Sequence, residues 1–266
     1  NAPFTAWDDV FGGGSYKNAP EGRPFFYVKN YYTTHESRIW LRKDKPMTVA
    51  PSAVAVPDYY ADIPIVREGI ARKYSNIEAL DKEVGVLLDQ LEADGVMENS
   101  VIFFWSDHGG NLLRQKRAVG DSGLHVPLII RYPNGYRAGE TESRMVSLMD
   151  LGPTVLSLTG QKPPKHMDGK AFAGPFEEAP RDYIFGSADR FDESTDMQRS
   201  VLDGRYVYIK NFMPELPLIS RNRYREQIPM NKHLIELDAE GKLEGDAAYI
   251  FMKTKPQEEL YDLKND

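Results

Sequence analysis

The feature that most constrains the fold is a long helical repeat followed by a continuously apolar run. From residue 66 to residue 91, apolar side chains recur every three or four positions, which predicts one long amphipathic helix. These side chains are Val66, Ile70, Tyr74, Ile77, Leu80, Val84, Leu87 or Leu88, and Leu91. Residues 101–105 are apolar throughout, as is typical of a central parallel strand. A helix leading into such a strand predicts an α/β fold.

Turn and capping signals bound the helix. Asp62 before Pro64 predicts a capping residue and a first-turn proline. Asp94 and Gly95 predict its end. We therefore expect a helix that fills most of residues 62–95.

The segments on either side of this unit are shorter. Residues 24–30 are aromatic and β-branched, which predicts a buried strand, whereas residues 33–57 have mixed charge and three prolines and predict a long loop. Residues 126–130 predict a second strand, and residues 150–160 predict a helix with Pro153 in its first turn.

After about residue 180 the predicted elements become short strands. Asp203-Gly204 lies between two apolar runs and is a strong hairpin signal. The predicted strands are residues 183–185, 200–202, 205–210 and 259–263. We therefore divide the chain into residues 1–180, an α/β part, and residues 181–266, a smaller antiparallel α+β subdomain.

Composition excludes several classes of function. Among 266 residues there is no cysteine, so disulfides, thiolate catalysis and cysteine-type zinc sites are ruled out. No apolar run approaches the roughly 18 residues of a membrane span, so none is expected. The net charge is −7 without a Lys/Arg block, which argues against a nucleic-acid partner. An anionic substrate would have to be held by local cations.

The pair Asp107-His108 stands where the apolar run of residues 101–105 stops. Ligands of open α/β sheets bind beyond the carboxyl ends of strands, and a carboxylate beside an imidazole can reach one divalent ion. Gly109 and Gly110 would let the backbone turn tightly beside it. The alternative is an ordinary strand-ending turn with an aspartate cap.

The surrounding motifs resemble the sulfatase family of the alkaline phosphatase superfamily. The resemblance rests on a strand followed by Ser-Asp-His-Gly, a lysine after a short loop, and Gly-x-x-Val-Pro-Leu-Ile. It extends to residues 24–28, 34–38, 76–95, 147–156 and 259–263, and so covers nearly the whole chain. It implies the carboxyl-terminal portion of an alkaline-phosphatase-like fold, with a mostly parallel sheet flanked by helices. Residues 181–266 would be its smaller antiparallel subdomain.

The resemblance also implies roles for four residues. Asp107 and His108 would be metal ligands, commonly of calcium; because His108 stands where many members have asparagine, manganese or zinc stays open. Lys116 would neutralise a sulfate oxygen, and His35 would lie near the bridging ester oxygen as a proton donor. The alternatives are an exposed lysine and a surface loop histidine.

Residues 188–199 form a dense polar cluster that we interpret as a loop. We hypothesise that it lies over the cleft and that Arg190 and Arg199 help to select the organic part of a sulfated sugar. The alternative is a solvated loop without a function.

The nucleophile of the family has no counterpart in the sequence. The resemblance implies a formylglycine made from Cys or Ser in a Cys/Ser-x-Pro-x-Arg motif, and the chain contains neither cysteine nor Ser-x-Pro-x-Arg. We expect the missing amino-terminal half of the same protein, ahead of Asn1, to carry the formylglycine and further metal ligands, so that this chain alone is inactive. The alternative is a degenerate homologue that binds glycans without turnover.

The activity implied by the resemblance is hydrolysis of sulfate esters or sulfamates. Residues 34–38 and the terminal region are closest to bacterial sulfatases related to heparan N-sulfatases, which implies a sulfated glycan as substrate. A phosphonate or phosphodiester hydrolase, or a phosphoethanolamine transferase, of the same superfamily is the rival activity. Family habit also implies export to the periplasm or beyond.

Overall fold

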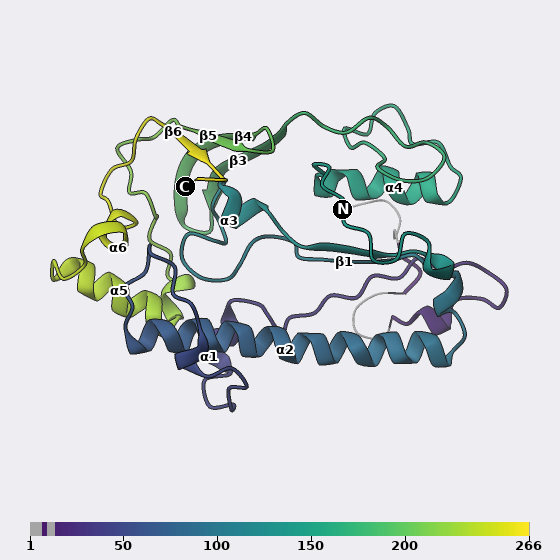
Figure 1. Cartoon of the computed structure of the whole chain (residues 1–266), viewed down its shortest axis with the longest axis horizontal. Coiled ribbons are helices and arrows are strands. Elements are labelled where there is room, and N and C mark those ends of the chain that lie inside the picture. Colours follow the sequence, from purple (N-terminus) through teal and green to yellow (C-terminus); the bar gives the residue numbers. More distant parts are fainter. Residues whose placement is uncertain (1–6, 10–13, 266) are drawn as a thin grey trace.

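The long predicted helix is the largest element of the fold. The computed structural model describes residues 7–9 and 14–265, and helix α2, Pro64–Ala93, runs along one whole side of them (Figure 1). Pro64 occupies the first turn and Gly95 follows the helix with a φ of +70°, so both end signals are confirmed. Asp62 does not cap the helix as predicted, because its carboxylate instead pairs with the guanidinium of Arg67 at 2.5 Å.

The other helices are short. They are α1 (Ser37–Leu41), α3 (Asp121–Leu124), α4 (Leu151–Leu158), α5 (Pro229–Ala239) and α6 (Gly245–Tyr249). Single 3-10 turns occur at Tyr16–Asn18, Pro51–Ala53, Met97–Asn99, Pro133–Gly135, Leu148–Asp150 and Arg225–Gln227. Helix α4, which follows a 3-10 turn and has Pro153 in its first turn, confirms the helix predicted over residues 150–160.

The strand ahead of Asp107 is antiparallel, not parallel as predicted. Strand β1, Ile102–Trp105, pairs with β2, Leu128–Arg131, in a two-stranded sheet that lies between α2 and α4 (Figure 1). A parallel pair needs a crossover of a dozen or more residues, usually a helix, that returns to the starting edge. The connection from β1 to β2, residues 106–127, is long enough for a crossover but contains only the four-residue α3, and the chain returns beside β1 in the opposite direction. No parallel pairing occurs in the described part of the chain.

A separate four-stranded antiparallel sheet follows, in the order β3-β4-β5-β6. Its strands are β3 (Ile184–Phe191), β4 (Ser194–Leu202), β5 (Tyr206–Asn211) and β6 (Glu258–Asp262). The hairpin at Asp203-Gly204 and the last strand are confirmed. Residues 188–199 were predicted to be a loop, and this prediction is wrong. They are the ends of β3 and β4, joined by a tight turn at Asp192-Glu193. The alternation of half-buried and exposed side chains along both strands accounts for the dense charge, because one face remains in water.

Two predictions before α2 are corrected. Residues 24–30 form no strand, because no neighbouring strand in the described residues pairs with them, and Phe25 and Phe26 remain exposed. The loop predicted over residues 33–57 is interrupted by α1 and by a 3-10 turn. The backbone there is ordered by local turns rather than by a sheet.

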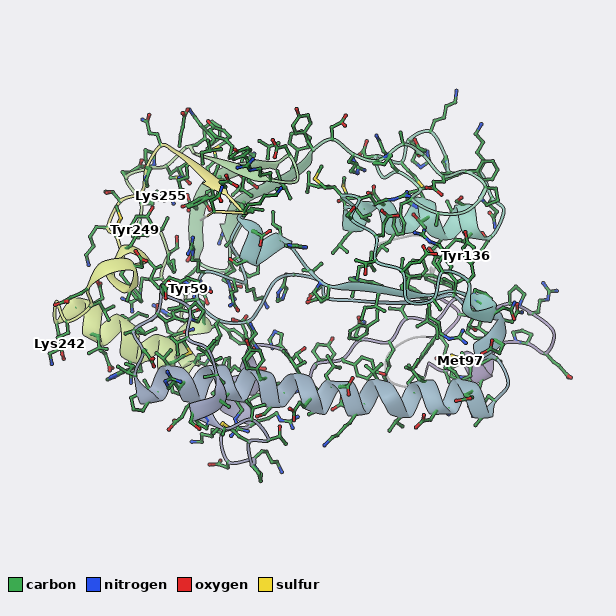
Figure 2. The ribbon with its side chains drawn as sticks, viewed as in Figure 1. Tyr59, Met97, Tyr136, Lys242, Tyr249 and Lys255 are labelled. Carbon is green, nitrogen blue, oxygen red and sulfur yellow. The ribbon has the colours of Figure 1, made fainter. Side chains whose placement is uncertain are left out.

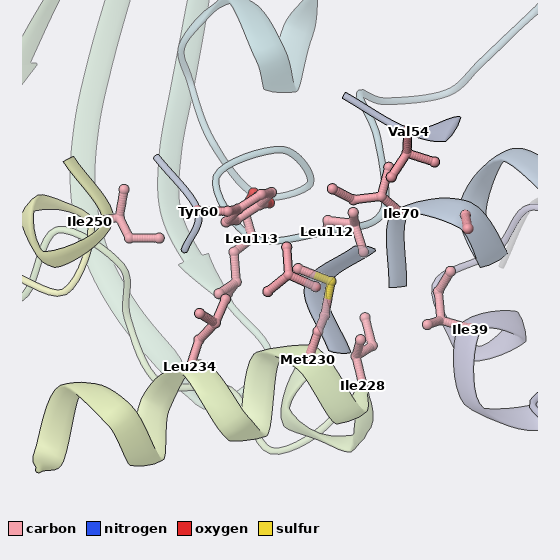
Figure 3. Packing of buried hydrophobic residues seen from close by; sticks show 12 residues of the cluster. Ile39, Val54, Tyr60, Ile70, Leu112, Leu113, Ile228, Met230, Leu234 and Ile250 are labelled. Carbon is pink, nitrogen blue, oxygen red and sulfur yellow. The ribbon is translucent and has the colours of Figure 1, made fainter. Parts of the chain in front are cut away.

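The main core joins early and late parts of the chain. Its buried side chains come from α1, α2 and the segment between them, from the loop after β1, and from the region of α5 and α6 (Figure 3). They are Ile39, Val54, Tyr60, Val66, Ile70, Ala71, Leu112, Leu113, Ile228, Met230, Leu234 and Ile250. Side chains occupy much of the space between α2 and the layers facing it, as Figure 2 shows around Tyr59. The predicted division at residue 180 stays a prediction.

No helix within residues 7–9 and 14–265 is both long and apolar enough to cross a membrane.

The contact of Gly69 on α2 with Met230 on α5 gives a test of this packing. A Cβ on Gly69 would lie 2.3 Å from Met230 Sδ and 2.9 Å from its Cγ, and Met230 is fully buried. We expect Gly69→Ala to lower the free energy of unfolding by about 1–3 kcal/mol, because overpacking outweighs the gain in helix propensity. Urea unfolding of the purified protein measures it.

The same substitution at Gly85 is the matched control. Gly85 lies in the same helix with no atom within 4 Å of the added Cβ. Gly85→Ala should raise the free energy of unfolding by about 0.5–1 kcal/mol. Equal effects at the two positions would contradict the α2–α5 contact described above.

Candidate functional site

A cleft of about 750 Å³ brings together four segments that are distant in the sequence. They are the start of α1, the loop after β1, the β3–β4 turn and the segment before α5. The lining residues are His35, Glu36, Lys116, Arg117, Phe191, Asp192, Glu193, Arg223, Tyr224 and Gln227. Both predicted catalytic residues, His35 and Lys116, therefore line one cleft.

A buried carboxylate organises the two cations of the cleft. The side chain of Glu36 is 1% exposed, and its Oε1 lies 3.0 Å from Lys116 Nζ. Both terminal nitrogens of Arg117 also donate to Glu36, at 2.9 and 3.0 Å, in a bidentate pair. Burial opposes ionisation of Glu36, but the hydrogen bonds from Arg117 and Lys116 outweigh it and lower its pKa.

The network continues to the opposite wall. Arg117 Nη2 contacts Asp192 Oδ2 at 3.2 Å, and its guanidinium lies 4.5 Å from the centroid of the Phe191 ring. The buried Asn222 donates to the same Asp192 oxygen at 2.8 Å. The β3–β4 turn is thereby fixed both to the loop after β1 and to the segment before α5.

The loop after β1 is closed by backbone contacts that place Lys116. The amide of Lys116 donates to Gly110 O at 2.8 Å, which closes the loop between these two residues. Gln115 Oε1 accepts from Lys73 Nζ on α2 at 3.1 Å and from the amide of Leu112 at 3.3 Å. Helix α2 thus holds the loop in place through the hydrogen bond from Lys73 to Gln115.

The two glycines after His108 leave no room for a Cβ, Gly109 because of backbone atoms and Gly110 because of side chains. A Cβ on Gly109 would lie 2.0 Å from Ser122 O, and the Gly109 amide donates to Gly123 O at 2.8 Å. A Cβ on Gly110 would lie 2.0 Å from Gln115 Oε1. The tight turn predicted from these glycines is confirmed.

His35 is held so that one ring nitrogen stays available as a donor. The backbone amide of Ser37 donates to Nδ1 at 3.3 Å, and Ser37 Oγ lies 2.9 Å from the same atom. Because Nδ1 accepts, the neutral ring carries its proton on Nε2. Desolvation, and then the charge of Lys116, lower the pKa of His35, which favours this neutral form near pH 7.

His108 has the opposite tautomer. Its Nδ1 lies 2.7 Å from the Gly109 carbonyl oxygen, which can only accept, so the proton is on Nδ1 and the Nε2 lone pair is free for a cation. Nε2 lies 3.5 Å from Asp107 Oδ1, and the Asp107 carboxylate is 85% exposed. These two donors fit a divalent ion but do not complete a site: no group of three or more metal-binding side chains occurs within residues 7–9 and 14–265.

The two predicted substrate-binding arginines do not line the cleft. Arg190 Nε donates to the carbonyl of Asp192, and Arg199 Nη1 pairs with Asp189 at 2.7 Å and with its neighbour's carbonyl. Their role in selecting the substrate stays a prediction.

Sequence reasoning missed most of the cleft walls. Glu36 lies inside residues 34–38, which carry part of the family resemblance, and Arg117 adjoins Lys116, so adjacency was an available signal for both. Asp192 was noticed only as part of a charged cluster. Nothing in the sequence places Arg223 or Tyr224 near His35, because only tertiary packing joins them.

Comparison with known proteins gives one consistent family. A family model described as Sulfatase matches residues 5–161. An ulvan-active sulfatase of Formosa agariphila is 37% identical over 300 residues, covering 100% of this chain and 50% of that protein. Human N-sulphoglucosamine sulphohydrolase is 26% identical over 184 residues, covering 65% of this chain and 37% of that protein. The chain spans half or less of the length of these relatives.

Solved structures show a shared fold. A candidate sulfatase of Bacteroides fragilis superposes with a TM-score of 0.52 at 18% identity, covering 81% of this chain and 52% of that one. A 2-O GAG sulfatase superposes with a TM-score of 0.50 at 15% identity, covering 86% and 53%. At these identities the likeness concerns the fold alone.

The Glu36 network predicts a large loss of stability on neutralisation. Glu36→Gln keeps the shape but leaves two nearly buried cations without their carboxylate, so we expect a loss of about 3 kcal/mol at pH 7. Because the folded-state pKa of Glu36 is lowered, its contribution is present above its unfolded pKa and is lost as pH falls through the folded value. The difference between the two proteins should therefore shrink below about pH 4.

Urea unfolding of both proteins between pH 3 and pH 8 tests this. Glu193→Gln is the control, since Glu193 lines the same cleft at its exposed rim and accepts from the backbone amide of Arg223. A difference independent of pH would show that Glu36 acts through packing and not through its charge.

Proposed function

The chain belongs to the sulfatase family, and from this premise we propose that the complete protein hydrolyses sulfate esters or sulfamates of glycans. The observation that carries the proposal is the placement of Lys116 and His35 in one cleft. The names of the relatives, an ulvan-active sulfatase and an N-sulphoglucosamine sulphohydrolase, support a sulfated sugar as the substrate class.

Lys116 has the free donors that a sulfate group requires. An ammonium carries three N–H groups, and Glu36 accepts only one hydrogen bond from it at 3.0 Å. The remaining donors can neutralise sulfate oxygens, while Glu36 fixes the position of the nitrogen. A pre-positioned charge in a partly desolvated cleft stabilises charge that develops in the transition state.

His35 can assist the leaving group in its neutral form. As the bond between sulfur and the sugar oxygen or nitrogen breaks, that atom gains negative charge and takes up the proton of His35 Nε2–H. Ser37 keeps Nδ1 as the acceptor, so the ring presents the N–H to the cleft. A neutral ring beside Lys116 also avoids placing two full positive charges together.

The proposed reaction also needs a divalent cation and a nucleophile, neither of which is a side chain of this chain. Asp107 and His108 would supply two ligands of a divalent cation, calcium or alternatively manganese or zinc, which when bound polarises the sulfate group. A formylglycine in another part of the complete protein would supply the attacking oxygen, because the chain contains no cysteine.

Removing Lys116 tests the proposed chemistry. In the complete protein, Lys116→Ala should lower kcat/KM for a sulfated sugar by about 100-fold or more. Arg114→Ala is the control, since Arg114 is a cation of the same loop that packs over the Tyr59 ring at 4.9 Å and does not line the cleft. Release of sulfate is measured, and a phosphodiester is assayed alongside. Turnover of the phosphodiester alone would replace the sulfatase proposal with the rival activity.

Metal binding can be tested without an activity assay. Adding Ca²⁺, Mn²⁺ or Zn²⁺ to the metal-free complete protein should raise Tm by a few degrees, since a ligand that binds only the folded state stabilises it. Asp107→Ala should abolish the rise. Asp121→Ala is the matched control, because Asp121 also contacts a histidine, His125, at 3.2 Å, but is not a proposed metal ligand. An unchanged rise in Asp107→Ala would place the metal elsewhere.

A further inference from the structure

The segment before α5 forms a rigid wall of the cleft. The Asn222 side chain, 1% exposed, donates to Asp192 and accepts from the Arg225 amide at 2.9 Å. Glu193 Oε1 accepts from the Arg223 amide at 2.7 Å. The backbone that carries Arg223 and Tyr224 is therefore fixed on both sides of these residues.

Tyr224 is the aromatic surface nearest the proposed proton donor. The centroids of the Tyr224 and His35 rings are 6.1 Å apart, and the Trp40 ring meets Tyr224 edge to face at 5.2 Å. Trp40 thus supports the ring while 39% of Tyr224 remains exposed at the cleft. The Tyr224 ring therefore lies beside His35 on the wall of the cleft.

Arg223 differs from the other two cations that line the cleft. Lys116 and Arg117 share Glu36, whereas the guanidinium of Arg223 makes no ion pair or hydrogen bond within the described part of the chain. The exposed carboxylate of Glu193 accepts a hydrogen bond from the Arg223 backbone amide and not from its guanidinium. The Arg223 fork is therefore available to bind a carboxylate or sulfate in bidentate geometry.

We propose, resting on the function proposed above, that Tyr224 and Arg223 form a sugar-recognition wall that selects substrates with a second acidic group. The sugar joined to the sulfate packs its C–H face on the Tyr224 ring, as apolar surfaces do on aromatic faces. The second group, a carboxylate or another sulfate on the same or the adjoining sugar, pairs with Arg223. Both are specificity-determining residues, and the sulfate under attack stays with Lys116.

The test of Arg223 uses matched pairs of sugars on the complete protein. One pair is a sulfated disaccharide with a hexuronic acid and its methyl ester; the other is D-glucosamine 6-O-sulfate and D-glucosamine 2-N,6-O-disulfate. We expect the unmodified protein to favour the more acidic member of at least one pair by about tenfold in kcat/KM. Arg223→Gln should reduce that ratio to about one, and Arg223→Lys should retain part of it. The pair that responds identifies the acidic group.

The test of Tyr224 compares loss and retention of the ring. Tyr224→Ala should raise KM for every sugar about tenfold with a smaller change in kcat, because it removes ring contact shared by bound substrate and transition state. Tyr224→Phe should stay within about twofold, since only the hydroxyl is lost. Equal losses in Tyr224→Ala and Tyr224→Phe would overturn the proposal. It would also be overturned if Arg223→Gln kept the preference for the more acidic sugar in both pairs.

Calorimetric titration separates this proposal from the proposed function. If the unmodified protein hydrolyses none of the sugars, the sulfatase proposal fails, and binding of the same pairs still decides the role of the wall. Preferential binding of the more acidic member that is lost in Arg223→Gln supports the wall. Preferential binding that is unchanged, or no binding by the unmodified protein, refutes it.

Discussion

The cleft depends on the buried carboxylate of Glu36. Moving three charges out of water is costly, and the cost is offset only where the geometry is good and the hydrogen bonds are satisfied. Glu36 meets this condition with a bidentate contact to Arg117 and one to Lys116. Because Arg117 also reaches Asp192, this one interaction aligns three of the four segments of the cleft.

Support for the carboxylate comes from the packing of α2. The loop that carries Lys116 lies above the helix, where Lys73 and the buried Leu112 and Leu113 join the two. Burial lowers the pKa of Lys73, yet its ammonium keeps a hydrogen bond to Gln115 that tightens the loop. The late helix α5 packs on the same part of α2, so the core and the cleft are stabilised by a common element.

Local patterns predicted the elements but not the way they meet. The period of α2 and the Asp203-Gly204 turn are short-range signals, and both were confirmed. The direction of β1 depends on the path of the chain after it, which no apolar run records. For the cleft, His35 and Lys116 were named through resemblance, whereas Arg223 and Tyr224 were missed because some 190 residues separate them from His35 along the chain. Arg190 and Arg199 were named for their charge, but in strands β3 and β4 their side chains make local contacts and do not line the cleft.

The opposite tautomers of the two histidines have an evolutionary consequence. Main-chain atoms favour the two tautomers: the Ser37 amide for His35, where Ser37 Oγ also contacts Nδ1, and the Gly109 carbonyl for His108. Side-chain exchange leaves both atoms in place, except that a proline at position 37 would remove the amide hydrogen. The walls of the cleft can therefore diversify by mutation while the two histidine tautomers, and with them the proposed division between proton donor and cation ligand, are inherited with the backbone itself.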